Sequence, residues 1–182
     1  SVMRSTSKEH YRPDLVLFVN GIPLCIIECK RPDMKEPLKQ AISQQIRSQQ
    51  EDGIRNLYVY SQLLLSLSCT QALYATNSTP EKFWAKWQEK FSSDEEEQNY
   101  KAKLYELKNN PLSTTTKEQL FTDRFKYVRQ YFDALEQEEI LPTIQDEYLF
   151  GLCRPERLMD IIFNFVLFDN GEKKIARYQQ FF

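Results

Sequence analysis

The sequence predicts an α/β (α+β) fold, in which a mixed β-sheet is flanked by helices and is followed by an all-helical C-terminal region. Three observations predict this fold. Two aliphatic stretches surround Asn20-Gly21, a stretch with helical periodicity begins at Pro37, and several strand-like segments follow it. Strands, one helix and further strands in that order are typical of a mixed sheet with helical cover.

The first element is a predicted β-hairpin with ionisable groups at its open end. Its strands are Leu15–Val19 and Ile22–Ile27, and Asn20-Gly21 between them is a strong signal for a tight turn. Asp14 precedes the first strand, and Glu28-Cys29-Lys30 follows the second. The hairpin therefore places two carboxylates and an amine at the same end of the two strands.

The register of this hairpin decides whether the two carboxylates meet. A plain two-residue turn pairs Val19 with Ile22 and leaves Asp14 and Glu28 on opposite faces of the sheet. A bulge or a three-residue loop shifts the register by one residue and sets Asp14 opposite Glu28. Pro23 has no N–H for the ladder, which favours an irregularity there. Both faces are apolar, so the pattern leaves both registers open.

The later elements are predicted from periodicity and turn residues. We expect a helix from Pro37 to about Asp52, strands at 57–60, 63–69 and 72–76, and a helix from Thr79-Pro80-Glu81 with Phe83, Trp84 and Trp87 in the core. The acidic stretch 92–98 is expected to be an exposed loop. Helical periodicity follows, with apolar positions over 121–135 and a helix that begins at Pro155. We therefore divide the chain into a core of residues 1–91 and a helical region of residues 92–182.

The net charge of −2 argues against a protein that binds nucleic acid over its whole surface, so any such contact must be a local basic patch. Two groups of basic residues are candidates. The first lies near the open end of the hairpin and consists of Lys30, Arg31, Lys35, Lys39 and Arg47. The second consists of Arg124, Lys126 and Arg129, which we interpret as a solvated helix face because charges of both signs alternate there.

The residue inventory excludes several classes of site. The only histidine, His10, lies in a polar stretch and is expected on the surface, which argues against catalytic triads and sites built on paired histidines. No glycine-rich phosphate-binding loop is present. The four cysteines show no CxxC spacing, and we interpret them as small buried residues: Cys25, Cys29, Cys69 and Cys153.

The apolar runs Leu63–Leu65 and Ile161–Phe168 are too short to cross a bilayer, and the polar start of the chain shows no secretory signal. We therefore expect a cytoplasmic protein that has no membrane partner.

The charged cluster at the hairpin indicates a chemistry. Two acidic side chains within reach of each other suit Mg²⁺, which prefers oxygen ligands. Lys30 lies on the same strand face as Glu28, because side chains alternate along a strand, and it could orient an attacking water beside a phosphate. Together these groups predict metal-assisted phosphodiester hydrolysis. Gln45, on the inward stripe of the predicted helix, is either a structural amide or a contact of this site, and its position beside the hairpin favours the second.

These residues resemble a known family. Asp14 with Glu28-Cys29-Lys30 resembles the PD-(D/E)XK nuclease signature, and the stretch from Arg12 to Glu28 is similar to the nuclease domain of the restriction (R) subunit of type I restriction-modification enzymes. The stretches 152–158 and 173–180 resemble the part of that subunit that leads into its motor. The similarity extends over nearly the whole chain.

The resemblance implies a restriction-endonuclease-like sheet and an endonuclease that cuts double-stranded DNA without reading its sequence. Asp14, Glu28 and Cys29 would belong to the Mg²⁺ site, Lys30 would position the water, and Gln45 would complete the catalytic set. An ATP-driven translocase would follow in the longer subunit, and this chain would not itself bind ATP. Modification and specificity subunits would be its protein partners.

One departure from the family pattern concerns the helix after the lysine. The family often shows Gln-x-x-x-Tyr there, whereas Gln45 is followed four residues later by Gln49. Two other hypotheses remain. The chain could be a non-catalytic docking module of a DNA translocase, with Asp14, Glu28 and Lys30 as a salt-bridge network. It could also be a stand-alone repair or junction nuclease, although its last residues read as an interrupted polypeptide.

Overall fold

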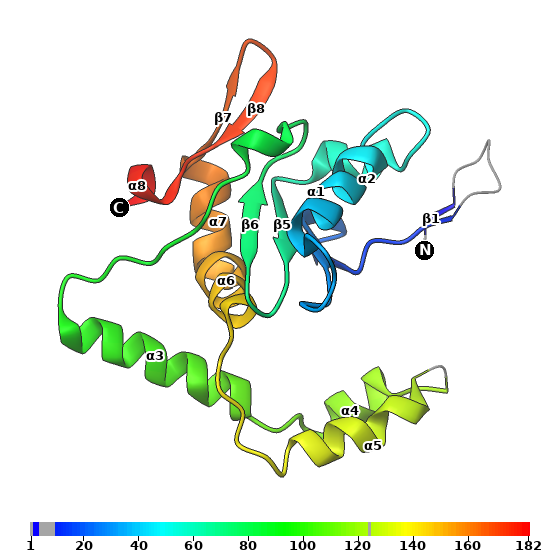
Figure 1. Ribbon diagram of the computed structural model, residues 1–182, viewed down its shortest axis with the longest axis vertical. Coiled ribbons are helices and arrows are strands. Elements are labelled where there is room, and N and C mark those ends of the chain that lie inside the picture. The colour runs from blue at the N-terminus through cyan, green and yellow to red at the C-terminus, as the bar shows by residue number, and fades with distance from the viewer. Residues whose placement is uncertain (1, 4–9, 124) are drawn as a thin grey trace.

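The computed structural model describes residues 2–3, 10–123 and 125–182. Its main sheet has the strand order β3-β4-β5-β6, and β5 and β6 are labelled near the centre of Figure 1. These strands are Leu15–Val19, Ile22–Cys29, Leu63–Leu67 and Ala72–Ala75. A short ladder of β1 (Val2–Met3) and β2 (His10–Tyr11) precedes them. The mixed α+β fold that the sequence predicts is therefore confirmed.

The β3–β4 hairpin has the irregular register that sets Asp14 opposite Glu28. Its turn residues Asn20 and Gly21 have φ values of 50° and 80°, the positive pair that a type I′ turn requires. The register shifts between Leu17 and Phe18, so that Leu15 pairs with Ile27. One further residue along each strand brings Asp14 and Glu28 across from each other. The bulge that the sequence left open is confirmed.

Strand β4 runs antiparallel to β3 and parallel to β5, and the parallel connection passes through two helices. These are α1 (Pro37–Ser48) and α2 (Arg55–Tyr60). Every residue of β5 is buried, and so are six consecutive residues of β4. Such continuous burial is typical of strands that are covered on both faces.

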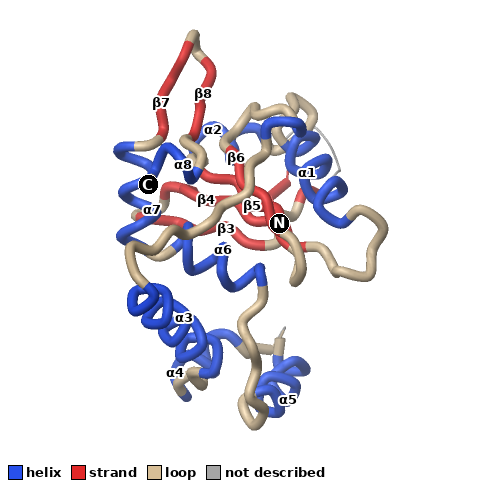
Figure 2. The backbone as a smooth tube through the Cα atoms, turned by 60° about the vertical axis from the view of Figure 1, so that its left-hand side comes forward, coloured by secondary structure: helices blue, strands red, loops and turns tan. Residues whose placement is uncertain are grey.

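The two faces of the sheet pack against helices from different parts of the chain. On one face, Ile26 and Leu64 pack with Ile42 of α1 and Tyr58 of α2. On the other face, β4 and β5 pack against α6 (Ile144–Cys153) and α7 (Pro155–Asn164), with α1 and these two helices on opposite sides of the strands in Figure 2. The second cluster comprises Cys25, Ile27, Leu63, Leu65, Leu67, Ala72, Tyr74, Trp87, Tyr148, Leu152, Leu158 and Ile161.

This second cluster includes residues from both sides of the boundary that the sequence places at 91/92. Leu152 and Ile161 come from the C-terminal half and are almost fully buried against the sheet of the N-terminal half. The division into residues 1–91 and 92–182 stays a prediction, but the hydrophobic core is continuous across it.

The predicted strand at 57–60 is wrong, because these residues belong to α2. Tyr58 is buried whereas Val59 and Tyr60 are exposed. Ile54 and Tyr58, four residues apart, pack into the same cluster, which is helical rather than strand spacing. The aromatic and β-branched residues here favour a strand locally, and tertiary packing overrides that preference.

The predicted helix from Thr79 is also wrong. Only the short 3₁₀ helix η1 (Glu81–Phe83) forms, and Ala85 then makes a β-bridge to Tyr74. The extended chain allows Trp84 to join the cluster on the α1 face and Trp87 the cluster on the α6–α7 face. Both tryptophans are core residues, as expected, whereas Phe83 is 52% exposed.

The predicted all-helical C-terminal region is wrong in one element, because β7 (Val166–Asp169) and β8 (Glu172–Ile175) form an antiparallel hairpin. Its turn is Asn170-Gly171, again with two positive φ values. The hairpin projects from the body of the molecule (Figure 1). The short helix α8 (Tyr178–Phe181) follows it.

The predicted exposed loop at 92–98 is largely wrong, because α3 (Asp94–Asn109) begins within it. The Ser93 side chain accepts a hydrogen bond from the Glu96 N–H, and the acidic first turn faces the positive end of the helix dipole. Helices α4 (Thr114–Leu120) and α5 (Lys126–Leu135) follow, away from the main sheet in Figure 1.

No helix in the described part of the chain is long and apolar enough to span a membrane. Two expectations fall outside the described residues: the surface position of the His10 side chain and the place of Arg124 in a basic helix face.

Candidate active site

Three of the predicted site residues come together at the C-terminal end of β4. The Lys30 ammonium lies 2.5 Å from Glu28 Oε1. Asp14 Oδ2 accepts a hydrogen bond of 2.8 Å from the Cys29 backbone N–H. The register shift in the β3–β4 hairpin is what brings Asp14 to this position. A strand end therefore carries two carboxylates and one ammonium as a single cluster.

The three groups differ in their contact with solvent. Glu28 is 2% exposed and lies on the face of β4 that is covered by α1, whereas Asp14 is exposed. The Lys30 side chain is 16% exposed. The cluster is thus open at Asp14 and closed behind Glu28, so a solvent-borne ligand reaches it from the Asp14 side.

The surroundings of Glu28 disfavour the charged form of its carboxyl group. Burial raises the pKa of Glu28, the Lys30 ammonium lowers it through a hydrogen bond and its charge, and the neighbouring Asp14 carboxyl raises it again. The net shift of the Glu28 pKa is upward, because burial together with the Asp14 carboxyl outweighs the effect of Lys30. A bound cation at this point would relieve both the burial cost and the repulsion.

Lys30 has a second partner that the sequence did not single out. Its ammonium donates to Gln44 Oε1 at 2.8 Å, so the lysine is held between Glu28 and helix α1. Gln44 lies beside the buried stripe of α1, which includes Ala41, Ile42 and Gln45. The rotation of α1 about its axis decides which glutamine faces the lysine, and no local sequence signal fixes that rotation.

Gln45, the glutamine that the sequence analysis placed in the catalytic set, lies deeper. Its side chain is fully buried, and its Nε2 donates to the Leu65 carbonyl at 2.7 Å and to Ser66 Oγ at 3.3 Å. Ser66 pairs with Glu28 in the parallel ladder, so Gln45 reaches the strand next to the cluster. Its Oε1 is buried without a protein partner. A direct role for Gln45 in catalysis stays a prediction.

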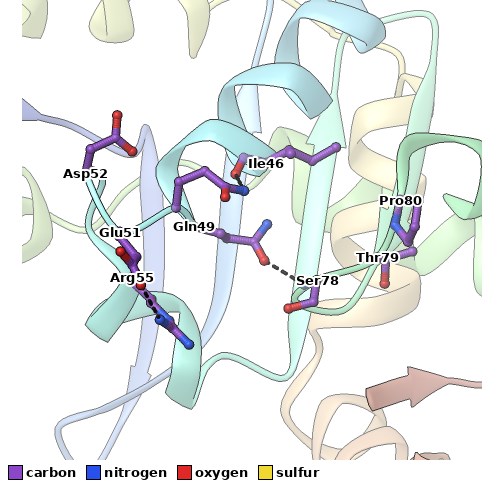
Figure 3. Close-up of a pocket in the computed structure, with 9 residues that line it drawn as sticks. Ile46, Gln49, Glu51, Asp52, Arg55, Ser78, Thr79 and Pro80 are labelled. Atoms are coloured by element: carbon purple, nitrogen blue, oxygen red, sulfur yellow. Dashed lines mark hydrogen bonds and ion pairs between the residues drawn. The ribbon is translucent and has the colours of Figure 1, made fainter. Parts of the chain in front are cut away.

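Gln49 and the surrounding hollow belong to a different part of the surface. Gln49 donates to the Gln45 carbonyl and accepts from the Ser78 N–H at 2.7 Å, which ties the end of α1 to the loop after β6 (Figure 3). The hollow beside it has a volume of about 930 Å³ and includes Glu51 and Asp52 in its wall. Asp14, Glu28 and Lys30 do not line it.

The donor set fits a hard cation with few protein ligands. No group of three or more His, Cys, Asp or Glu side chains is arranged to hold a metal ion in the part of the chain that the structure describes. Asp14 and Glu28 supply two carboxylates, which matches the small number of protein ligands that Mg²⁺ uses alongside water and phosphate oxygens. The residues present therefore fit Mg²⁺.

Cys29 makes its contact in the cluster through its backbone. Burial, followed by the charges of Asp14 and Glu28, raises the pKa of the Cys29 thiol to about 11, so the thiol is protonated at neutral pH. A protonated sulfur is a poor ligand for a hard cation. A role for Cys29 at a metal would therefore have to come from its main chain, and it stays a prediction.

The comparison with known families decides the identity of this region. Residues 2–83 match the family described as "Type I restriction enzyme R protein N terminus", and this stretch contains the whole cluster from Asp14 to Gln45. Residues 2–83 of the chain belong to the N-terminal region of the type I restriction enzyme R proteins. The family resemblance seen in the sequence is thus confirmed.

Two curated relatives extend the likeness of this R protein region beyond the matched residues. The putative type I restriction enzyme MjaIXP endonuclease subunit of Methanocaldococcus jannaschii is 28% identical over 175 residues. The type I restriction enzyme HindI endonuclease subunit of Haemophilus influenzae is 30% identical over 176 residues. These alignments cover 94% and 93% of this chain but only 14% and 13% of the relatives. No solved structure matches the R protein region significantly.

Proposed function

We propose that this R protein region is a Mg²⁺-dependent endonuclease that hydrolyses the phosphodiester bonds of double-stranded DNA. The observation that carries the proposal is the convergence of Asp14 and Glu28 through the irregular register of the β3–β4 hairpin. The names of the two relatives, both endonuclease subunits, support it. The cut would be independent of sequence, and it would follow ATP-driven translocation by a motor outside this chain, in a cytoplasmic complex with modification and specificity subunits.

Each residue of the cluster has a role in this proposal. Asp14 and Glu28 would hold the ion, and the hydrogen bond from Cys29 N–H fixes the orientation of the Asp14 carboxylate. When bound, Mg²⁺ supplies Lewis-acid activation of a phosphoryl oxygen and lowers the pKa of a bound water. Lys30, held between Glu28 and Gln44 with its side chain 16% exposed, would orient the water and face the scissile phosphate.

The first prediction tests this assignment in the complete restriction enzyme. Glu28→Gln removes one charged ligand, so we expect loss of DNA cleavage by at least about a hundredfold, while ATP hydrolysis by the motor continues. Asp14→Asn and Lys30→Ala should give the same pattern. Cleavage of plasmid DNA and release of phosphate from ATP are the two measurements.

Glu51→Gln is the matched control, because the Glu51 side chain is 90% exposed and lies outside the cluster. Titration calorimetry of this chain with Mg²⁺ or Mn²⁺ separates the nuclease from the docking module. Binding that is lost in Glu28→Gln supports the nuclease. Full cleavage by the Glu28→Gln enzyme, or no binding of either ion at millimolar concentration, would contradict it.

A further inference from the structure

Helix α1 has an exposed polar face beside the candidate active site. The outward positions of the helix and the residues that follow it are polar or basic: Lys39, Gln40, Ser43, Gln44, Arg47 and Gln50. Gln44 and Arg47 are three residues apart, which makes them neighbours on the helix surface. Gln44 also accepts the hydrogen bond from Lys30. The face therefore passes beside the Asp14–Glu28–Lys30 cluster at Gln44, with Lys39 and Arg47 on either side of that point along the helix.

The charge of this face has one sign. From Pro37 to Gln50 the sequence contains no aspartate or glutamate, and its two charged residues are Lys39 and Arg47. Lys39 is 60% exposed and makes only a long ion pair of 3.6 Å with Glu36. Arg47 is exposed and forms no ion pair with another described residue. Exposed side chains of this kind remain available to an anionic partner at small cost in desolvation.

The distance between the two basic residues of this face matches the spacing of phosphates along a nucleic-acid strand. Lys39 and Arg47 are eight residues apart, which corresponds to about 12 Å along the helix axis. On one strand of B-DNA this is the rise of roughly three to four nucleotides. Amide and hydroxyl side chains between the two cations, from Gln40 and Ser43, are ordinary donors to phosphate oxygens.

We propose that the exposed face of α1 binds the phosphate backbone of the DNA duplex that is cut, with Lys39 and Arg47 as its two phosphate contacts. This inference rests on the proposed nuclease function and names the surface that holds its substrate. The DNA backbone then runs along α1 between Lys39 and Arg47, and at Gln44, between these two residues, it lies beside Lys30 and the exposed Asp14. The contact is to phosphate alone and is independent of base sequence.

The distribution of charge along the chain favours the exposed face of α1 over other surfaces as the DNA-binding site. Residues 1–91 contain twelve lysines and arginines against nine aspartates and glutamates, whereas residues 92–182 contain twelve against seventeen. The first turn of α3 is wholly acidic, and the hollow at the end of α1 has Glu51 and Asp52 in its wall. Both repel a polyanion. Figure 2 shows α1 at the outside of the molecule, where a duplex has access.

The second prediction tests the proposal on this chain with a short fluorescent duplex of arbitrary sequence. The double variant Lys39→Ala/Arg47→Ala should lower the affinity several-fold and reduce the slope of log K against log salt by about 2. Fluorescence anisotropy at several salt concentrations measures both quantities. The control is Lys101→Ala/Lys103→Ala, which removes two exposed lysines from α3 and changes the net charge equally.

The outcomes distinguish this proposal from the nuclease assignment. We expect the α1 double variant to keep its Mg²⁺ binding, and Glu28→Gln to lose Mg²⁺ binding while its metal-free affinity for DNA stays at least that of the wild type. Equal losses of DNA affinity in the α1 and α3 double variants would overturn the α1 surface. So would an unchanged salt slope in the α1 variant, and neither result would bear on the metal site.

Discussion

At the scale of single residues, Glu28 lies where its surroundings disfavour the charged form of its carboxyl group. The pKa of Glu28 is raised by burial and by Asp14, and Lys30 offsets only part of this. A folded-state pKa above the ordinary value of 4.5 means that the folded protein holds this proton more tightly than the unfolded chain does. The ionisation of Glu28 therefore works against folding.

The third prediction follows from the upward direction of the shift in the Glu28 pKa. The contribution of Glu28 to stability is complete below pH 4.5 and is lost as the pH rises through the raised folded-state pKa. Glu28→Gln should therefore raise the free energy of unfolding at neutral pH, by about 1 kcal/mol, without metal. The gain should shrink as the pH is lowered towards 4.5. Urea unfolding at a series of pH values measures it.

Magnesium should reverse the order of stability of the wild type and the Glu28→Gln variant. Saturating Mg²⁺ stabilises a protein that binds it only in the folded state, by about 2.7 kcal/mol at a hundred times the Kd. The wild type should gain this stability and Glu28→Gln should not. A variant that is less stable than the wild type without metal at neutral pH would contradict the electrostatic account of the cluster.

At the scale of elements, two hairpins share one turn signal and differ in what they were predicted to be. Asn20-Gly21 joins β3 to β4, and Asn170-Gly171 joins β7 to β8, each with two positive φ values. The first pair predicts a turn because aliphatic strands flank it. The second is flanked by charged residues and by a stretch with helical periodicity, although the same dipeptide signal was present.

The β7–β8 hairpin is attached to the C-terminal end of α2 by a buried cation. Lys173 of β8 is 9% exposed, and its ammonium donates to the Ser61 carbonyl at 2.8 Å. No carboxylate among the described residues forms an ion pair with it. Burial lowers the pKa of Lys173 below 10.5, so the unfolded chain holds this proton more tightly than the folded protein does.

The fourth prediction uses that shift. Because the folded-state pKa is the lower one, the contribution of Lys173 to stability rises with pH as the pH increases through the lowered folded-state pKa towards 10.5. Lys173→Met should remove this rise and should raise the free energy of unfolding at pH 7 by about 1 kcal/mol. Lys174→Met, whose side chain is 50% exposed, is the control and should show no gain. A wild type and a Lys173→Met variant with parallel pH profiles would contradict the argument.

At the scale of the whole molecule, strand β4, which carries Glu28, depends on helices that follow it by more than a hundred residues. Ile27, one residue before Glu28, packs in the same cluster as Leu152 and Ile161. Tyr74 of β6 donates to the Ala176 carbonyl at 2.7 Å. The C-terminal half therefore stabilises the position of β4, even though the family profile covers only residues 2–83.

The fifth prediction tests this dependence. Leu152 is fully buried, so Leu152→Ala should lower the free energy of unfolding by about 2–5 kcal/mol. Both tryptophans, Trp84 and Trp87, lie in the N-terminal half, so their fluorescence reports whether that half unfolds together with the mutated helix. The control Leu141→Ala changes a side chain that is 74% exposed and should stay within about 0.5 kcal/mol. An unshifted tryptophan transition in Leu152→Ala would mean that the two halves unfold independently.

The sequence by itself determined the β3–β4 hairpin, the sheet with helical cover, and the group of Asp14, Glu28 and Lys30. Each of these depends on local signals: a turn dipeptide, aliphatic strands, and charged residues a fixed number of positions away. The family followed from the same residues. The sequence did not determine the secondary structure of α2 or of the segment around Trp84. In both segments the local preference for strand or helix is overridden by packing against the rest of the protein.

Only the tertiary structure decided how the site is completed. Whether Asp14 faces Glu28 depended on a bulge between two apolar faces that the pattern could not distinguish. Whether Gln44 or Gln45 meets Lys30 depended on the rotation of α1 against the sheet, which Ile42 and its neighbours fix by packing. Both are contacts between segments far apart in the chain, and the free energy that selects them comes from burial, which no single segment contains.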